Sequence, residues 1–161
     1  MKTISIAFCF LSLFTLASCI GEFDNEPPDM QVLRESRPLG SAKEFSVHLK
    51  YDVGQLDIMK ISDDNLFSID LQYNKRKYDP TFSFSEGDHA SMRLDMNSNN
   101  RIGGRGRRDS ELTVRLNEKV TLDLDVATGV SESHLDMTGL KVRRMRLHGG
   151  VGKTEVTFDK P

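Results

Sequence analysis

Residues 121–158 read TLDLDVATGVSESHLDMTGLKVRRMRLHGGVGKTEVTF, and this stretch contains the same pattern twice. When Gly129-Val130 is set over Gly150-Val151, an offset of about 21 residues superposes four apolar pairs: Leu124 on Met145, Val126 on Leu147, Leu135 on Val156 and Met137 on Phe158. Strand repeats near 20 residues with recurrent glycines are typical of stacked β-coils, each of which buries its apolar edge on the next. The strand that holds Leu124 is therefore predicted to lie beside the strand that holds Met145.

The same offset aligns two acids with two bases, Asp123 with Arg144 and Asp125 with Arg146. If the coils stack in register, each acid lies beside a base on the outer face, where such a pair contributes about 0.2–1 kcal/mol. Arginines that already face carboxylates have less capacity for a ligand. The apolar phase slips by one residue between positions 142 and 145, so a bulge there would re-aim Arg143 or Arg144.

The rest of the chain after Gly40 alternates between apolar and polar residues, which is the period of half-buried strands. The alternating runs are Phe45–Leu49, Phe67–Tyr73, Phe82–Phe84, Met92–Met96, Leu112–Leu116 and Val120–Val126. A fainter copy of the repeat, Val53-Gly54-Gln-Leu56-Asp-Ile58, precedes most of them. The predicted fold is all-β, a solenoid-like rack of stacked β-coils with repeats of about 21 residues, and a β-sandwich is the alternative.

Three segments in this order resemble the toast-rack domain of bacterial envelope proteins. They are SAKEFSVHLKYDVGQLDI at 41–58, LFSIDLQYN at 66–74 with Asp79-Pro80 beyond it, and LNEKVTLDLDVATGVSESHLDMTGLKVRRMRLHGGVGKTEVTFD at 116–159. The resemblance covers residues 35–159 and extends to cell-wall-stress response proteins with a similar C-terminal rack. It implies a rack of strands and an envelope location, but no established biochemical activity. The Arg/Gly-rich insert before Leu112 departs from the family pattern.

The first residues, MKTISIAFCFLSLFTLASC, have the pattern of a secretory signal with a basic start at Lys2. Their apolar stretch is too short to span a bilayer, which takes about 20 apolar residues. The junction Leu16-Ala17-Ser18-Cys19 resembles the lipobox of bacterial lipoproteins, in which the cysteine is acylated and becomes the mature N-terminus. We therefore predict a removed signal peptide over residues 1–18 and a lipid, such as palmitate, on Cys19.

Residues 19–33 are predicted to hold the lipidated cysteine and an acidic tether, and residues 34–161 the β domain. Cys9 lies in the signal, so no disulfide is expected in the mature chain. Ile20 is not the aspartate that marks inner-membrane retention, which favours the outer membrane facing the periplasm in a Gram-negative cell. The formal net charge of −2, from 22 Lys and Arg against 24 Asp and Glu, gives no general attraction for nucleic acid or anionic lipid.

The segment GGVGKT, from Gly149 to Thr154, imitates a phosphate-binding loop. The P-loop pattern needs a glycine where this chain has Leu147, and a helix after the loop whose N-terminus faces the anion. The residues that follow, EVTFDKP, alternate like a strand instead. We predict no bound nucleotide, and we interpret the glycines as a corner between two strands that needs positive φ.

Other candidate chemistry is sparse. The four histidines, His48, His89, His134 and His148, share no metal-ligand spacing, so no metal or cofactor is expected. Asp123 and Asp125 point to one open face without an apolar pocket, and the serines at 41, 131 and 133 lack a nucleophile-elbow context. The sequence therefore predicts a protein that is not an enzyme.

The insert NSNNRIGGRGRRDS, residues 97–110, concentrates Arg101, Arg105, Arg107 and Arg108 among glycines. Guanidinium groups bind phosphate and carboxylate in a bidentate manner, so the insert is either a solvated loop or a contact for an anion or partner.

Together these features favour a membrane-anchored, non-catalytic envelope lipoprotein that acts as an interaction or scaffold module, with a possible place in envelope stress response. Its partner would be an envelope protein or polymer. The alternatives are a polyanion-binding lipoprotein that uses the Arg/Gly insert, and an enzyme acting on envelope polymers.

Overall fold

The computed structural model describes residues 27–98 and 110–159, and this part of the chain forms eight β-strands and no helix. The strands are β1 (Met30–Pro38), β2 (Glu44–Ile61), β3 (Asn65–Asn74), β4 (Tyr78–Ser85), β5 (His89–Ser98), β6 (Ser110–Asn117), β7 (Thr121–Asp136) and β8 (Lys141–Thr157). The all-β prediction is confirmed, because every alternating run of the sequence lies within or at the edge of one of these strands.

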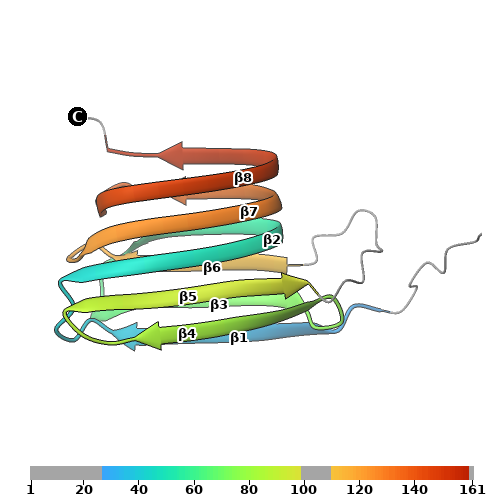
Figure 1. Ribbon diagram of the computed structural model, residues 1–161, viewed down its shortest axis with the longest axis horizontal. Coiled ribbons are helices and arrows are strands. Elements are labelled where there is room, and N and C mark those ends of the chain that lie inside the picture. The colour runs from blue at the N-terminus through green and yellow to red at the C-terminus, as the bar shows by residue number, and fades with distance from the viewer. Residues whose placement is uncertain (1–26, 99–109, 160–161) are drawn as a thin grey trace, which may run out of the picture.

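Three long strands, β2, β7 and β8, stack parallel to one another like the bars of a rack (Figure 1). Each turns sharply near its middle, so its first part, the front leg, lies in one layer and its second part, the back leg, in the other. Leu124 of β7 lies between Val47 of β2 and Met145 of β8. The predicted offset of about 21 residues and the adjacency of the two strands are therefore confirmed.

The lower half of the rack is built differently. β5 pairs parallel with the front leg of β2, and β6 pairs parallel with its back leg. Antiparallel strands complete each layer: β4 on β5, then β3 on β6, and β1 on β3. The front sheet thus contains β4, β5 and the front legs, and the back sheet contains β1, β3, β6 and the back legs. The structure therefore combines the predicted coil with its sandwich alternative. We call the three bent strands rungs: β2 is the first and β7 the second, and β3 to β6 lie between these two in the sequence although β7 stacks directly on β2.

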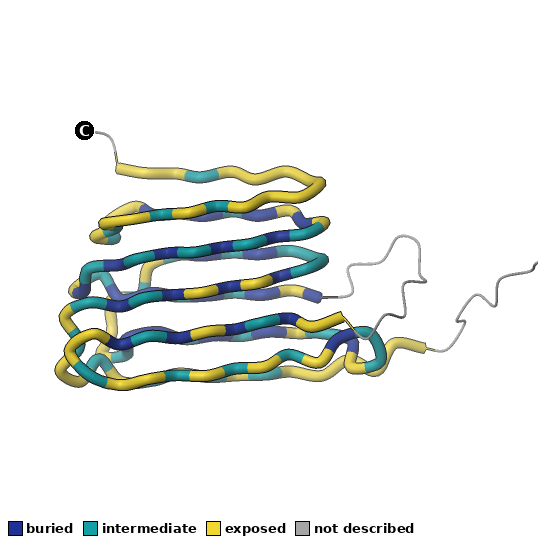
Figure 2. The backbone as a smooth tube through the Cα atoms, viewed as in Figure 1, coloured by how far each residue is buried: buried dark blue, intermediate teal, exposed yellow. Residues whose placement is uncertain are grey.

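The core fills the space between the two sheets (Figure 2). Alternate residues of every front and back strand point inward, as their period of two requires. Near the lower end, Phe45 of β2 stacks on Phe67 of β3 with ring centroids 5.5 Å apart, and Phe67 meets Phe84 of β4 at 5.4 Å. Such aromatic pairs bury large areas and tie the front sheet to the back sheet.

The glycines of GGVGKT lie within β8, at the corner between its two legs. Gly152 has a φ of 146°, which side chains rarely adopt, so the predicted corner with positive φ is confirmed at this residue. Gly150 is required for a different reason: a Cβ there would collide with the carbonyl of Gly129 on the rung below. Gly129 makes the same close approach to the carbonyl of Asp52. Successive corners therefore touch backbone to backbone.

Two segment boundaries differ from the prediction. β1 begins at Met30, inside the segment predicted as tether, because its backbone pairs with β3 from Asn74 onward. The Arg/Gly insert is predicted at 97–110, yet β5 continues to Ser98 and β6 starts at Ser110. Ser110 is only 2% exposed, and its hydroxyl bonds to the Tyr51 hydroxyl at 3.0 Å and to the Val53 carbonyl. This residue therefore belongs to the core.

The contact between corners predicts unequal effects of alanine at two glycines. Gly129→Ala should lower the free energy of unfolding by about 1–3 kcal/mol, because its Cβ must displace the Asp52 carbonyl. Gly149→Ala is the matched control, since its Cβ would have nothing within 4 Å and its stability should be unchanged or slightly raised. Thermal unfolding of the two variants tests this. Equal melting temperatures would contradict the requirement for close corners.

A charged face on the front sheet as candidate functional site

The outward side chains of the front sheet form rows that cross the strands, because the strands are parallel and in register. One row is Arg93 on β5, His48 on β2, Asp125 on β7 and Arg146 on β8. The next is Ser91, Ser46, Asp123 and Arg144 on the same strands. The prediction that Asp125 and Arg146 lie side by side on one face is confirmed. We call these two rows and the residues beside them the charged face.

The predicted bulge is present, and it re-aims Arg143. The register between β7 and β8 shifts at Leu122/Asp123, so Arg143 is the extra residue on β8. Its guanidinium lies against the Glu44 carboxylate at 2.8 and 3.0 Å and against the Asp123 carboxylate at 2.8 and 3.0 Å. One arginine thus clamps three stacked rungs, β2, β7 and β8, with bidentate geometry on both carboxylates.

This clamp changes the electrostatics of its partners. The Arg143 hydrogen bonds hold the pKa of Asp123 and the pKa of Glu44 below their ordinary values. The Glu44 carboxylate also contacts the His89 imidazole at 3.1 Å. The carboxylates in turn raise the pKa of Arg143, Asp123 first and Glu44 second. Because the folded-state pKa of each carboxyl is depressed, the clamp contributes stability above the unfolded-state pKa. This stability is lost as the pH falls through the folded-state value.

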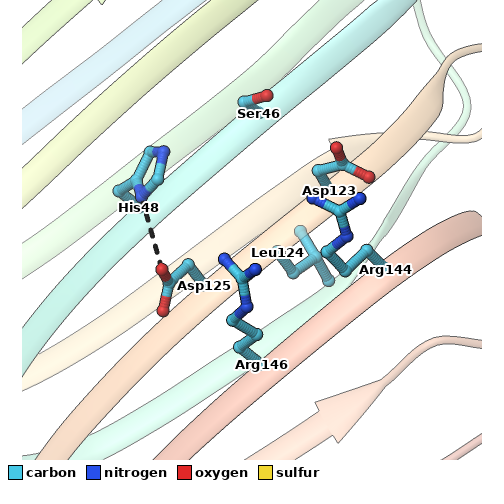
Figure 3. Close-up of a pocket in the computed structure, with 7 residues that line it drawn as sticks. All are labelled: Ser46, His48, Asp123, Leu124, Asp125, Arg144 and Arg146. Atoms are coloured by element: carbon cyan, nitrogen blue, oxygen red, sulfur yellow. Dashed lines mark ion pairs between the residues drawn. The ribbon is translucent and has the colours of Figure 1, made fainter.

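Arg144 and Arg146 are more available than the sequence suggested. Among the described residues neither has a carboxylate oxygen within 4.0 Å, and the carboxylate of Asp123, the neighbour of Arg144 in the register, is bound by Arg143. The predicted adjacency of acid and base is present in the register, and the charges of both arginines help to lower the pKa of Asp123, although neither arginine forms a close ion pair among the described residues. Figure 3 shows both at the rim of a shallow depression of about 140 Å³, lined by Ser46, His48, Asp123, Leu124, Asp125, Arg144 and Arg146.

A second depression of about 360 Å³ continues the first, and the two share His48 and Asp125. It is lined by His48, Leu49, Lys50, Arg93, Asp95, Asp125 and Ala127. Arg93 is paired with Asp95 at 2.8 Å within this depression. Both hollows lie on the outside of a sheet, so their polar groups are reached directly from solvent. Two guanidinium groups two residues apart on one strand, about 7 Å along it, suit a carboxylate- or phosphate-bearing partner.

A catalytic use of this face would need a nucleophile bonded to a base. Ser46, His48 and Asp125 are the residue types of a triad, but His48 Nδ1 lies 3.8 Å from the Asp125 carboxylate. Within the described part of the chain, Ser46 and His48 form no hydrogen bond with each other. Ser131 and Ser133 are instead buried in the back leg of β7, where their hydroxyls bond at 3.0 Å. In this structure Ser46, His48 and Asp125 are therefore not arranged as a triad.

The remaining predicted positions are separated in space or lie outside the described residues. His134 lies on the back leg of β7, 3.3 Å from Asp57, whereas His48 and His89 lie on the front strands. In the ranges 27–98 and 110–159 no cluster of three His, Cys, Asp or Glu is placed to hold a metal ion. None of these residues forms a helix with the length and apolarity of a membrane span. Cys19 and the four arginines of the insert, Arg101, Arg105, Arg107 and Arg108, fall outside them.

Sequence reasoning missed the residues that the lower rungs contribute, namely Glu44, Lys50, Arg93 and Asp95. For Lys50 the sequence held a signal, namely the faint copy of the repeat at 53–58. When the alignment of this copy with residues 130–135 is extended back along the strand, it places Lys50 beside Ala127 and His48 beside Asp125, as in the structure. No comparable signal exists for β5, whose pairing with β2 is fixed only by the tertiary fold.

The clamp predicts a pKa change that a single substitution can reveal. In Arg143→Gln the pKa of Asp123 should rise toward its ordinary value, because the guanidinium hydrogen bonds that depress it are lost. Glu118 is an internal control, since Lys60 at 3.1 Å lowers its pKa independently. Side-chain carboxyl titration by NMR measures both groups. An unchanged Asp123 would show that Arg143 does not hold it in solution.

Comparison with known proteins finds a protein family and solved structures that this chain resembles. The family model described as the N-terminal domain of toast_rack, DUF2154, matches residues 24–160. The crystal structure of a "putative cell adhesion protein" from Clostridium sporogenes ATCC 15579 superposes with a TM-score of 0.69 at 18% identity, over 81% of this chain and 61% of that chain. For a "putative adhesin" from Bacteroides fragilis NCTC 9343 the TM-score is 0.45 at 11% identity, over 81% of this chain and 56% of that one.

At 18% identity the likeness to the Clostridium structure shows a shared fold alone, and this chain spans less than two thirds of either structure. None of the curated proteins matches the chain. The family match extends over all of the described strands, including the three bent rungs and the antiparallel strands below them. The protein therefore belongs to the Toast_rack_N family.

Proposed function

We propose that the protein is a non-catalytic interaction module of the bacterial cell envelope, held at the membrane by a lipid on Cys19. The charged face of the front sheet is its contact surface. The observation that carries this proposal is the pair Arg144 and Arg146, which stand at the rim of an open depression without a carboxylate within 4.0 Å among the described residues. Family membership and the Clostridium protein, described as an adhesion protein, support an envelope role.

The position of β1 suggests how the rack faces the membrane. Met30, the first residue of β1, pairs with Asn74 at the end of the molecule where the long strands turn their corners. A tether from Cys19 to Asp29 spans at most about 35 Å, so a lipid on Cys19 would keep this corner end close to the bilayer. The turns at 39–43, 86–88 and 118–120 would then point away from the bilayer. The charged face would extend from the bilayer into the periplasm or the extracellular space.

The chemistry of the face favours an anionic partner. A partner that presents carboxylates or phosphates gains charge-assisted hydrogen bonds from Arg144 and Arg146, each contributing about 1.5–3 kcal/mol. An enzyme acting on envelope polymers is the weaker alternative, because the serine and histidine of the face lack the hydrogen bond that would activate a nucleophile. A shallow, solvent-open surface also suits a protein or polymer better than an enclosed small molecule.

The lipid anchor is tested by removing its thiol. Cys19→Ser eliminates the sulfur that can be acylated, so the variant should move from the detergent phase to the aqueous phase of a Triton X-114 partition. The wild-type protein should remain in the detergent phase. If both forms partition alike, the protein is not anchored through Cys19, although the contact surface remains testable on its own.

The contact surface is tested by photo-crosslinking in intact cells. A photoreactive residue at position 91, on the front sheet, should capture an envelope component, and one at position 113, on the back sheet, should not. Arg144→Gln with Arg146→Gln should reduce capture at position 91 by about tenfold or more, because two charged hydrogen bonds are lost. The matched control is Arg34→Gln with Arg115→Gln on the back sheet. Equal capture from both sheets, or no effect of the front pair, would refute the proposal.

A further inference from the structure

The end of the rack at which the three rungs turn, which we call the corner end, carries most of the exposed apolar side chains. Five large hydrophobic side chains are exposed among the described residues: Met30, Val32, Val130, Val151 and Phe158. The first four lie at or beside the corner end, because β1 begins there and the corners of β7 and β8 form it (Figure 1). Phe158 follows the end of β8, at the other end of the rack. Such a gathering of exposed apolar groups indicates a contact surface.

The corner of β7 reverses the usual polarity of a strand. Thr128 and Ser131 are buried there, whereas Val130 is 57% exposed. In the register Val130 lies between Val53 of the rung below and Val151 of the rung above, so its exposure is toward the end of the rack and not toward a neighbouring rung. In water the opposite arrangement would leave less apolar area exposed. The corner therefore suits surroundings less polar than water.

A basic turn lies at the same end, beside the point where the predicted tether joins the domain. It consists of Lys75-Arg76-Lys77, between β3 and β4. The buried side chain of Asn74 holds both segments, because its Oδ1 accepts hydrogen bonds from the backbone N–H of Asp29 at 3.3 Å and from that of Arg76 at 3.1 Å. The N–H of Lys75 also donates to the Asp29 carbonyl at 2.9 Å. The acids Asp29 and Asp79 flank the turn, and its three cations outnumber them.

We propose that the corner end binds the surface of a phospholipid bilayer, with its exposed apolar side chains in the boundary between headgroups and acyl chains and its basic turn against lipid phosphates. Apolar side chains gain free energy by entering this boundary, and a lysine or arginine close to an anionic lipid surface strengthens binding. The contact is separate from the charged face, which lies on the front sheet. It rests on the proposed function only for the lipid on Cys19, which would bring this end to the bilayer.

Contact at the corner end would also orient the molecule. The legs of β2, β7 and β8 run away from this end (Figure 1), so they would stand upright on the bilayer. A tether alone leaves the domain free to turn, whereas a bound corner end holds the charged face at a fixed angle to the membrane. This restriction lowers the entropy cost of binding a partner that is itself fixed in the envelope.

The test uses tryptophan as a reporter, because the chain contains none. The full chain with Val130→Trp is purified from membranes and reconstituted in vesicles of phosphatidylethanolamine and phosphatidylglycerol whose acyl chains carry bromine, a contact quencher of tryptophan. Ser85→Trp is the matched control, because Ser85 is exposed and level with Asp123, about 23 Å from Val130 along the strand direction. Quenching should be about threefold stronger or more at position 130 than at position 85, because only the corner end enters the bilayer.

Substitutions in the Val130→Trp chain separate the contact from the anchor. Val32→Asp should reduce the quenching by about half or more, because it places a charge where an apolar side chain meets the bilayer. Ser36→Asp is its matched control, exposed on the same outward face of β1 but farther from the corner end. Neutralising the basic turn should reduce the quenching as well, whereas the same loss of charge at the opposite end should not. These two sets are Lys75→Gln, Arg76→Gln and Lys77→Gln, and Lys43→Gln, Lys119→Gln and Lys141→Gln.

Flotation of the same vesicles distinguishes this contact from the lipid anchor. A chain that floats with the vesicles but is quenched equally at positions 130 and 85 would overturn the contact and leave the anchor standing. Equal effects of the two charge sets, or of Val32→Asp and Ser36→Asp, would also overturn it. A chain that does not float with the vesicles would refute the anchor and the contact together.

Discussion

The close backbone contact between stacked corners is the constraint on which the rest of this molecule depends. β2, β7 and β8 each carry a front leg and a back leg, and both layers stay in register only if the three corners lie directly on one another. The corners touch through carbonyl groups that leave no space for a Cβ at Gly129 and Gly150. Any side chain there would force the rungs apart in both sheets at once, because one continuous strand serves both.

Registered stacking also creates the charged face. Because the rungs do not slip, residues at equivalent positions form straight rows, and a row such as His48, Asp125 and Arg146 gathers charges from segments far apart in sequence. The single irregularity between β7 and β8 matters for the same reason. It frees Arg143 from the row to clamp Glu44 and Asp123, so that the carboxylate beside Arg144 is already bound. A one-residue bulge thus separates a structural arginine from two that face solvent.

Two separate strands take the place of one bent strand below β2. β5 pairs with the front leg of β2, up to Asp95 beside Lys50, and β6 pairs with the back leg, from Glu111 beside Gln55. β5 and β6 together therefore form the rung below β2, and the described ends of these two strands lie near the corner of β2 at Gly54.

The sequence alone determined the strand content, the repeat of about 21 residues, and the register that sets Asp125 beside Arg146. These features are local in kind: alternation sets which side of a strand is buried, and a repeat between adjacent segments predicts that they stack. It also located the slip before Met145 that becomes the bulge. Only the tertiary structure decided that β3 to β6 separate the first rung from the second, that β5 and β6 share one rung, and that Arg143 takes the carboxylates. Those outcomes depend on pairings between residues 20 to 99 positions apart, and the two legs of a bent strand must satisfy two sheets together, which no local pattern records.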